Sequence, residues 1–453
     1  MTSPIGFASA SPPEAKVRIS TWDAADSIRL PVLRTVPPYA TTLRVTRPPG
    51  APANHRPKNM KITKSILIPA SGGKKAFLRV DTIYAGPTGV ALIQECAELV
   101  ASDTFGISFL RHSPDGGQTW SELRPAYTPR KTSCGTERQG ESALLLDGSR
   151  NRVIRFFNHS LYPGDTHTRE VVGLTAIYFE VSTDAGRTFS KPQQLIIPGG
   201  TPDSPAPGIT RGENCQMISF SVPFIDTAGR IILPMQRYHK APEALSVYLI
   251  PLDAGCLIGE CRADGSITWK TGGMACTDLK ESSRGLCEPS ISELRDGRFL
   301  MVCRGSNASL QSVPGRKWAC LSEDGGTTWS NPEPFRYDNG DLFFSPATGS
   351  RLIRSTKNGK LYWIGNITPT NPNGNLPRYP LVIGEVDEES TRLIQSSVHT
   401  IDDREEDEDA KLQISNFRAF EDRVTGDFRV AAARLFFDSL ETTATWEYRI
   451  AVT

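Results

Sequence analysis

The chain has 453 residues, which is enough to bury a large hydrophobic core. Its 51 basic and 50 acidic residues leave a formal charge of +1, so a nucleic-acid partner is not expected. No stretch of 18 consecutive apolar residues occurs, so a membrane span is not expected either. The 38 glycines and 34 prolines are typical of a chain built from many short strands and tight turns.

Residues 1–58 are rich in proline and serine and are predicted to form an extended arm or wrapping segment before a domain over 59–453. The first residues lack the long apolar stretch of a signal peptide. The protein is therefore expected to be either intracellular or secreted after removal of a leader, and we favour the secreted form. The nine cysteines include no C-x-x-C motif and do not decide the compartment; most are expected to be buried thiols.

From residue 59 onward, short runs of alternating apolar and polar residues are separated by turn residues. Such a period of two is typical of β-strands, and no strongly amphipathic helix longer than two turns is predicted. The clearest runs are "KITKSILIP" (61–69), "GVALIQE" (89–95), "RIILPMQ" (230–236), "RFLMVCR" (298–304) and "KLYWIG" (360–365). The domain is therefore predicted to be all-β.

A short motif recurs along these strands at intervals of roughly 60 to 80 residues. Units of this length that contain several strands predict the blades of a β-propeller, with six blades expected and seven as the alternative. The motif is clearest in "HSPDGGQTW" (112–120), "STDAGRTF" (182–189) and "SEDGGTTW" (322–329), and weaker in "RADGSITW" (262–269) and "EVDEESTR" (385–392).

Each copy of the motif is interpreted as a turn between the third and fourth strands of a blade. The Ser and Asp side chains bind the local backbone, Gly adopts positive φ, and the aromatic residue fills the gap between sheets. Metal binding is the alternative, but no copy has the closing Glu of a calcium loop. We therefore expect no catalytic metal and no required cofactor. A structural calcium ion, for example at the acidic run 402–410, stays an option.

The repeated motif resembles the Asp-box of the sialidase-like β-propellers, and the similarity covers roughly residues 59–453. This resemblance implies an active site on the propeller axis, at the face opposite the boxes. In that superfamily three arginines hold the carboxylate of the substrate, a Glu–Tyr pair supplies the nucleophile, and an Asp is the general acid. The resemblance therefore implies a glycan substrate.

Two segments resemble the strands that carry the first half of this site. "AFLRVDTIYAGPTGVALIQE" (76–95) places Arg79 at the position of the first arginine. "GLCEPSISELRDGRFLMVCR" (285–304) is the strongest match and places Glu288 and Arg304 at the positions of the catalytic Glu and the second arginine.

The remaining parts of the site match less completely. "NPNGNLPRYPLVI" (371–383) supplies Arg378 as the third arginine. The segment expected to carry the nucleophilic Tyr (413–435) has Ser415, Asn416 and Phe417 instead, so this Tyr is predicted to be missing. Asp103 is the nearest candidate for the general acid. Tyr379 is next to Arg378, but neighbouring residues of a strand point to opposite faces, so it is not expected to replace the Tyr.

Three arginines on one face predict a grip on a carboxylate, and Glu288 beside them stays ionised and serves as base or relay. The main hypothesis is an exo-acting, sialidase-like glycosidase that acts at a carboxylate-bearing sugar. The second is hydrolysis or β-elimination of L-rhamnose linked to D-glucuronate, in which Tyr238 or His239 of "ILPMQRYHK" (232–240) takes a proton. The third is a propeller that binds sugars without catalysis.

Overall fold

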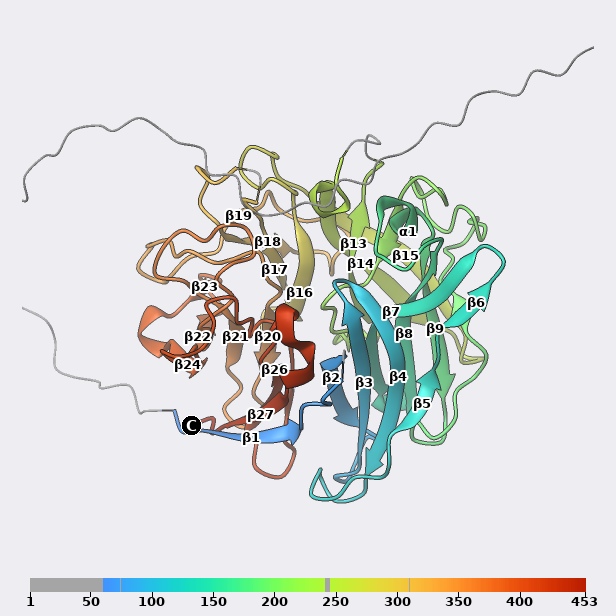
Figure 1. The fold of residues 1–453 in the computed structure, drawn as a ribbon, viewed down its shortest axis with the longest axis horizontal. Coiled ribbons are helices and arrows are strands. Elements are labelled where there is room, and N and C mark those ends of the chain that lie inside the picture. The colour runs from blue at the N-terminus through green and yellow to red at the C-terminus, as the bar shows by residue number, and fades with distance from the viewer. Residues whose placement is uncertain (1–59, 74, 241–244, 309) are drawn as a thin grey trace, which may run out of the picture. The chain divides into compact units, whose positions relative to one another are not determined.

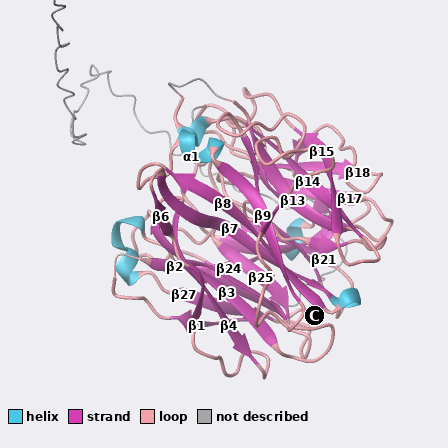
Figure 2. Cartoon of the chain, turned by 90° about the vertical axis from the view of Figure 1, so that its right-hand side faces the viewer, coloured by secondary structure: helices cyan, strands magenta, loops and turns pink. Residues whose placement is uncertain are grey.

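The computed structural model describes residues 60–73, 75–240, 245–308 and 310–453, so the predicted arm over 1–58 lies outside the described residues. The described residues form six antiparallel sheets of four or five strands, arranged around a central axis (Figure 1). The predicted six-bladed, all-β propeller is thereby confirmed. Helical structure in the described residues is limited to α1 (Arg169–Gly173) and four short 3-10 turns (Figure 2).

The first three blades follow one another along the chain. The first contains β2 (Ala76–Tyr84), β3 (Leu92–Ala101), β4 (Thr104–Ser113) and β5 (Arg124–Tyr127). The second contains β7 (Gly135–Asp147), β8 (Arg152–Tyr162), β9 (Thr175–Ser182) and β10 (Gln193–Gln194), with β6 (Arg130–Thr132) beside β7. The third contains β11 (Cys215–Met217), β13 (Ile231–Tyr238), β14 (Leu252–Cys261) and β15 (Ile267–Ala275), with β12 (Phe224–Ile225) beside β13.

The last three blades complete the ring. The fourth contains β16 (Cys287–Glu293), β17 (Phe299–Arg304), β18 (Lys317–Ser322) and β19 (Glu333–Pro334). The fifth contains β20 (Arg351–Arg354), β21 (Leu361–Asn366), β22 (Leu381–Asp387) and β23 (Arg392–Leu393), with β24 (His399–Asp402) beside β22. The sixth contains β25 (Phe417–Glu421), β26 (Phe428–Ala433), β27 (Thr445–Ile450) and β1 (Ile62–Ile68).

The Asp-boxes lie between the third and fourth strands of their blades, as predicted. In the first box, Ser113 Oγ accepts a hydrogen bond from Gly117 N at 2.7 Å, and Asp115 Oδ1 accepts one from Thr119 N at 2.8 Å. The second and third clear copies repeat both bonds. These local bonds favour the ionised form of Asp115 and lower its pKa to about 2. The box side chains are thus occupied within their own turns.

The aromatic residue of a box packs between neighbouring blades. Trp269, from the weaker fourth copy, is buried, and its ring lies 5.8 Å from Phe156 and 6.0 Å from Phe179 in the second blade. Such edge-on contacts between large rings stabilise the sheet-to-sheet packing.

The sixth blade joins the two ends of the domain. Its outer strand β1 pairs with β27, so that Ile62 lies opposite Ile450 and Ile66 lies opposite Trp446. The third and fourth strands of this blade come from opposite ends of the described domain. No turn connects them, which explains why this blade has no Asp-box.

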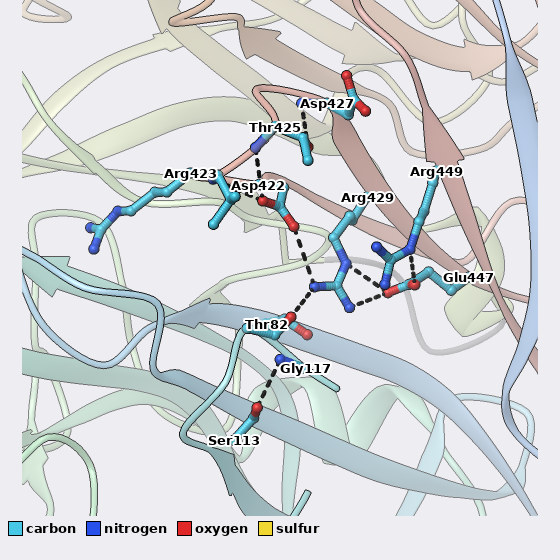
Figure 3. Close-up of polar contacts among 12 residues, drawn as sticks. Thr82, Ser113, Gly117, Asp422, Arg423, Thr425, Asp427, Arg429, Glu447 and Arg449 are labelled. Atoms are coloured by element: carbon cyan, nitrogen blue, oxygen red, sulfur yellow. Dashed lines mark hydrogen bonds and ion pairs between the residues drawn. The ribbon is translucent and has the colours of Figure 1, made fainter. Parts of the chain in front are cut away.

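Three arginines, of which Arg152 and Arg429 are buried, also link successive blades. Arg152 donates to Gly265 O at 2.6 Å, Arg298 to Glu388 O at 3.2 Å and Arg429 to Gly116 O at 2.7 Å. In each case an arginine at, or directly before, the start of a blade's second strand reaches the Asp-box turn of the next blade. Figure 3 shows Arg429 between Asp422 and Glu447, with the first Asp-box close by.

The cysteines, the helices and the possible metal ligands can each be compared with what the sequence predicts. All nine cysteines are free thiols, and six of them are buried. In the part of the chain that the structure describes, no helix is long and apolar enough to cross a membrane. Among the same residues, no group of three or more His, Cys, Asp or Glu side chains is placed to hold a metal ion.

Candidate active site

A cavity of about 280 Å³ opens at the end of the propeller axis where the innermost strands begin. Segments from all six blades line it, including the turn between β3 and β4, the first half of β7 and the start of β16. Because β2, β3 and β4 alternate in direction, the first Asp-box, which follows β4, lies at the other end of the axis. The cavity therefore lies at the face opposite the boxes.

Glu288 enters this cavity because the backbone of β16 is irregular. Cys287 lies opposite Arg304, but the next regular pair is Ser290 with Val302, so β16 contains a β-bulge at Glu288. Glu288 has φ of 47°, a left-handed conformation that is unusual for a residue with a side chain. Its N–H donates to Gln236 Oε1 at 2.9 Å. Such strain is concentrated at functional sites.

The carboxylate of Glu288 is paired directly with an arginine. Arg304 Nη1 lies 2.6 Å from Glu288 Oε1. Burial by itself raises the pKa of Glu288, but the charges of Arg304, Arg378 and Lys317 outweigh burial, so that pKa lies below its ordinary value of 4.5. Glu288 is therefore ionised at neutral pH, as the sequence predicted.

Arg378 lines the same cavity from the segment between β21 and β22. Its Nη1 donates to Gln413 Oε1 at 2.8 Å, and its Nη2 donates to Ala347 O at 3.3 Å. Burial, together with repulsion from Arg304, lowers the pKa of Arg378 to about 10. Gln413 also lines the cavity and belongs to the segment in which a nucleophilic Tyr was expected.

Arg79 does not line the cavity. It is buried on β2, where its Nη1 lies 3.1 Å from Glu141 Oε2 and its guanidinium lies 5.3 Å from the centre of the Phe105 ring. Glu141 and Phe105 are themselves lining residues. Of the three arginines predicted to converge, Arg304 and Arg378 line the cavity and Arg79 lies behind its wall.

Arg284 lines the cavity and was missed from the sequence. It is only 9% exposed, and neither a hydrogen bond nor an ion pair joins its side chain to another described residue. Its Nε is buried without a partner. The only signal was its place in "SSRGLCEPS", four residues before Glu288. A buried cation without a protein partner favours an anionic ligand.

Asp103 lies at the rim of the cavity, in the turn between β3 and β4. Tyr162 Oη donates to its backbone oxygen at 3.0 Å. His167, which the sequence did not indicate, is also a lining residue, and its Nδ1 is buried without a partner. Burial lowers the pKa of His167, the charge of Asp103 opposes this, and Arg284 adds to it.

Tyr238 and His239 were both candidate proton acceptors, and the fold separates them. Tyr238 lines the cavity, and burial raises its pKa to about 12. His239 is outside the lining, with its Nε2 2.9 Å from Asp253 Oδ2 and 42% of its side chain exposed. Successive residues of an extended chain point to opposite faces, which accounts for the difference.

Neither Phe417 nor Tyr379 brings a phenol into the cavity in place of the tyrosine missing from the 413–435 segment. Phe417 is buried in the core, with its ring 5.1 Å from that of Phe220. Tyr379 packs against the core and lies 5.5 Å from the guanidinium of Arg404, outside the lining of the cavity.

The model of the BNR repeat-like domain family matches residues 109–415, which is more than half of the chain. The chain therefore belongs to this family of sialidase-like, Asp-box β-propellers. No curated protein is similar enough in sequence to count as a relative.

Solved structures with the same fold are distant in sequence. A Dyadobacter fermentans protein of unknown function is 14% identical with a TM-score of 0.59, over 86% of this chain and 99% of that one. A Trypanosoma rangeli sialidase in complex with the inhibitor DANA is 12% identical with a TM-score of 0.57, over 86% of this chain and 59% of that one. A point mutant of the NanB sialidase from Streptococcus pneumoniae is 14% identical with a TM-score of 0.56, over 85% of this chain and 70% of that one. At these identities the likeness concerns the fold.

Proposed function

We propose that the protein is an exo-acting carbohydrate-active enzyme that cleaves a terminal glycosidic bond at a carboxylate-bearing sugar. The observation that carries the proposal is the combination of an ionised, strained Glu288 with two arginines, Arg284 and Arg378, that lack acidic partners within ion-pair distance in the described residues. Two solved structures with a similar fold are named as sialidases, which agrees with a carboxylate-bearing sugar as the substrate.

The substrate carboxylate is held by Arg284 and Arg378. Arg304 is already paired with Glu288, so its main role is to keep that carboxylate ionised and oriented. Guanidinium groups bind carboxylates through two parallel hydrogen bonds, which a lysine cannot reproduce. These two arginines, which have no acidic partner, therefore set the orientation of the sugar.

Hydrolysis requires one proton donor and one proton acceptor. Asp103, at the rim, gives its proton to the oxygen of the leaving group as the bond from that oxygen to the anomeric carbon breaks. Glu288 takes a proton from a water molecule whose oxygen bonds to the same carbon. Tyr238, with a pKa of about 12, stays a neutral phenol and donates a hydrogen bond to the sugar.

The size of the cavity favours action at a chain end. Its volume of about 280 Å³ lies just below the usual range for ligand sites, roughly 300–1,000 Å³, and suits one sugar ring. Tyr248 and Phe437 line its rim with 46% and 40% of their surface exposed. Exposed rings at this place suit the apolar face of the next sugar.

β-Elimination at a uronate is a second candidate, because Tyr238 and His167 lie in the same cavity as Arg284. In this reaction a base takes the C5 proton, the C4–oxygen bond breaks, a C4–C5 double bond forms, and the leaving oxygen takes up a proton to depart as a hydroxyl group. The arginines neutralise the carboxylate and thereby acidify the C5 proton.

One substrate panel tests these possibilities. The protein is incubated with a chromogenic sialoside and with an arabinogalactan capped by rhamnosyl-glucuronate. Free sialic acid, or free rhamnose without new ultraviolet absorbance, supports hydrolysis; free rhamnose with the absorbance of an unsaturated uronate supports elimination. Sugar binding without release of any product contradicts both and leaves a binding protein.

Variants of the same strand supply the control. Glu288→Gln removes the proposed base, whereas Glu293→Gln changes a glutamate at the other end of β16, outside the cavity. Activity is expected to fall in the first variant and to stay unchanged in the second. Equal activity in Glu288→Gln and the wild type would remove Glu288 from the mechanism.

A further inference from the structure

A second cavity, of about 650 Å³, lies at the other end of the propeller axis. The last residues of β2, β7 and β16 line it, together with β20, β25 and residues 222–227 of the third blade. We call it the box-face funnel, because these strands end at the face that carries the Asp-boxes. Its volume lies within the roughly 300–1,000 Å³ of ordinary ligand sites.

Most charged groups around the funnel already have partners in the protein. Glu293 accepts hydrogen bonds from the N–H of Thr227, at 2.8 Å, and from its hydroxyl. Glu421 accepts one from Thr356 N at 2.7 Å. Arg354 lies 2.7 Å from Glu388. These groups hold neighbouring loops together and are not available to a ligand.

Arg351, the first residue of β20, is different. Its side chain forms no hydrogen bond or ion pair with any other residue that the structure describes, and its Nε is buried without a partner. Burial lowers its pKa to about 10. The residue as a whole is half-buried, so its cationic group is only partly withdrawn from water. A partly buried cation without a partner costs free energy, and that cost is reduced when an anion binds.

The charge of Asp81 acts on Arg351 but forms no ion pair with it. Asp81 accepts a hydrogen bond from Leu144 N at 3.3 Å, and no ion pair joins it to Arg351. Burial is the main cause that raises the pKa of Asp81. The positive charge of Arg418 also lowers the pKa of Arg351. Arg418 itself forms an ion pair with Glu141 at 2.9 Å.

The walls of the funnel are largely apolar and aromatic. They include Tyr84, Val222, Pro223, Phe224 and Phe420. We propose that the box-face funnel binds a small monocarboxylate with an apolar or aromatic body, whose carboxylate pairs with Arg351. The site is separate from the proposed glycan site and does not depend on its chemistry.

Benzoate is the probe for this site, and benzamide is its neutral counterpart of the same shape. Binding is measured by calorimetry on the full chain. We expect benzoate to bind the wild type and benzamide to bind at least about tenfold more weakly, because only benzoate pairs with a guanidinium. Equal binding of both, or no binding of benzoate, overturns the proposal.

Three variants locate the bound benzoate. Arg351→Gln is expected to weaken binding at least about tenfold. Arg295→Gln, an exposed arginine of the same funnel that is paired with Glu388, is expected to bind as the wild type does. Arg378→Gln also keeps binding if benzoate lies in the funnel; loss of binding in that variant alone assigns benzoate to the other cavity and overturns the proposal.

A stability measurement separates a ligand-binding arginine from a structural one. Because Arg351 is unpaired without its ligand, Arg351→Met is expected to raise the Tm of the free protein by roughly 1–4 °C. A residue kept for binding at the expense of stability behaves in this way. A fall in Tm would mean that Arg351 stabilises the fold, and the proposal would then be wrong.

Discussion

Glu288 is the residue on which the proposed chemistry depends most. A bulge in β16 and a positive φ turn its side chain into the cavity, where Arg304 holds it in the ionised state. A regular strand would need neither feature. The backbone of β16 is thus irregular at the point where a carboxylate is delivered to the axis.

Removing the charge of Glu288 should therefore affect rate more than folding. Glu288→Gln keeps the size of the side chain, and kcat is expected to fall by about 10²–10⁴-fold, the usual contribution of a general base. Steady-state kinetics on the substrate found in the panel measures this. A change in KM with kcat unchanged would contradict a role in proton transfer.

The pH dependence of activity is a second prediction at this scale. The pKa of Glu288 is lowered in the folded protein, so its carboxylate is lost only when the pH falls through that lowered value, below 4.5. The acid limb of kcat/KM that belongs to Glu288 is therefore expected below pH 4.5. The limb that belongs to Glu288 is the one that is absent in Glu288→Gln. If this limb lies above pH 4.5, Arg304 does not stabilise the carboxylate as inferred.

At the scale of an element, β18 supports the cavity through a buried lysine. Lys317 lies opposite Arg304 in the sheet, and its Nζ donates to Pro346 O at 3.3 Å and to the backbone oxygen of Thr348. The residue between them, Ala347, accepts the hydrogen bond from Arg378. Lys317 thus acts as a positioning residue for Arg378.

Replacing Lys317 tests this role by kinetics. Lys317→Met loosens the 346–348 segment, so KM for the acidic substrate is expected to rise several-fold while kcat changes little. Lys317→Arg, which can still donate to the carbonyl groups, is expected to restore part of the loss. A fall in kcat with unchanged KM would contradict a positioning role.

The same lysine has a signature in stability. Burial favours the neutral amine and lowers the pKa of Lys317 from 10.5 to about 7; the charge of Glu288 opposes this shift and the charge of Arg304 adds to it. Between these values the unfolded chain binds a proton that the folded chain has released, so the free energy of unfolding rises with pH. The free energy of unfolding, measured with denaturant from pH 7 to 10, is expected to rise in the wild type. In Lys317→Met this rise is expected to be smaller, because the contribution of Lys317 is absent.

At the scale of the whole molecule, the ring is closed by strand pairing and by Arg429. This buried arginine donates to Glu447 at 2.6 Å and to Gly116 O at 2.7 Å, so it joins the last blade to the first (Figure 3). Arg429→Met leaves Glu447 buried and less compensated, and is expected to cost about 3–5 kcal/mol of unfolding free energy.

The matched control is Arg449→Met. Arg449 contacts the same Glu447 at 2.9 Å, but 51% of its side chain is exposed, so its loss is expected to cost about 0–1 kcal/mol. Urea unfolding of both variants measures the difference. Equal costs would show that Arg429 does not contribute to closure of the ring beyond an ordinary surface pair.

The sequence by itself determined the architecture of this protein. Each Asp-box is held by hydrogen bonds between residues two to four positions apart, as between Ser113, Asp115 and Thr119, so its turn can be read without knowing the rest of the chain. The repeats then specify blades. Glu288 and Arg304 could also be placed, because they lie on paired strands of a single hairpin.

Only the tertiary structure decided which side chains share the cavity. Arg79 was predicted at the site, but Glu141 from the next blade holds it behind the wall, whereas Arg284 and His167 reach the cavity from loops without a motif. Which side chains face the axis depends on bulges, strand register and contacts between distant blades. Those contacts are set by packing of the whole ring, and a local pattern of residues does not encode them.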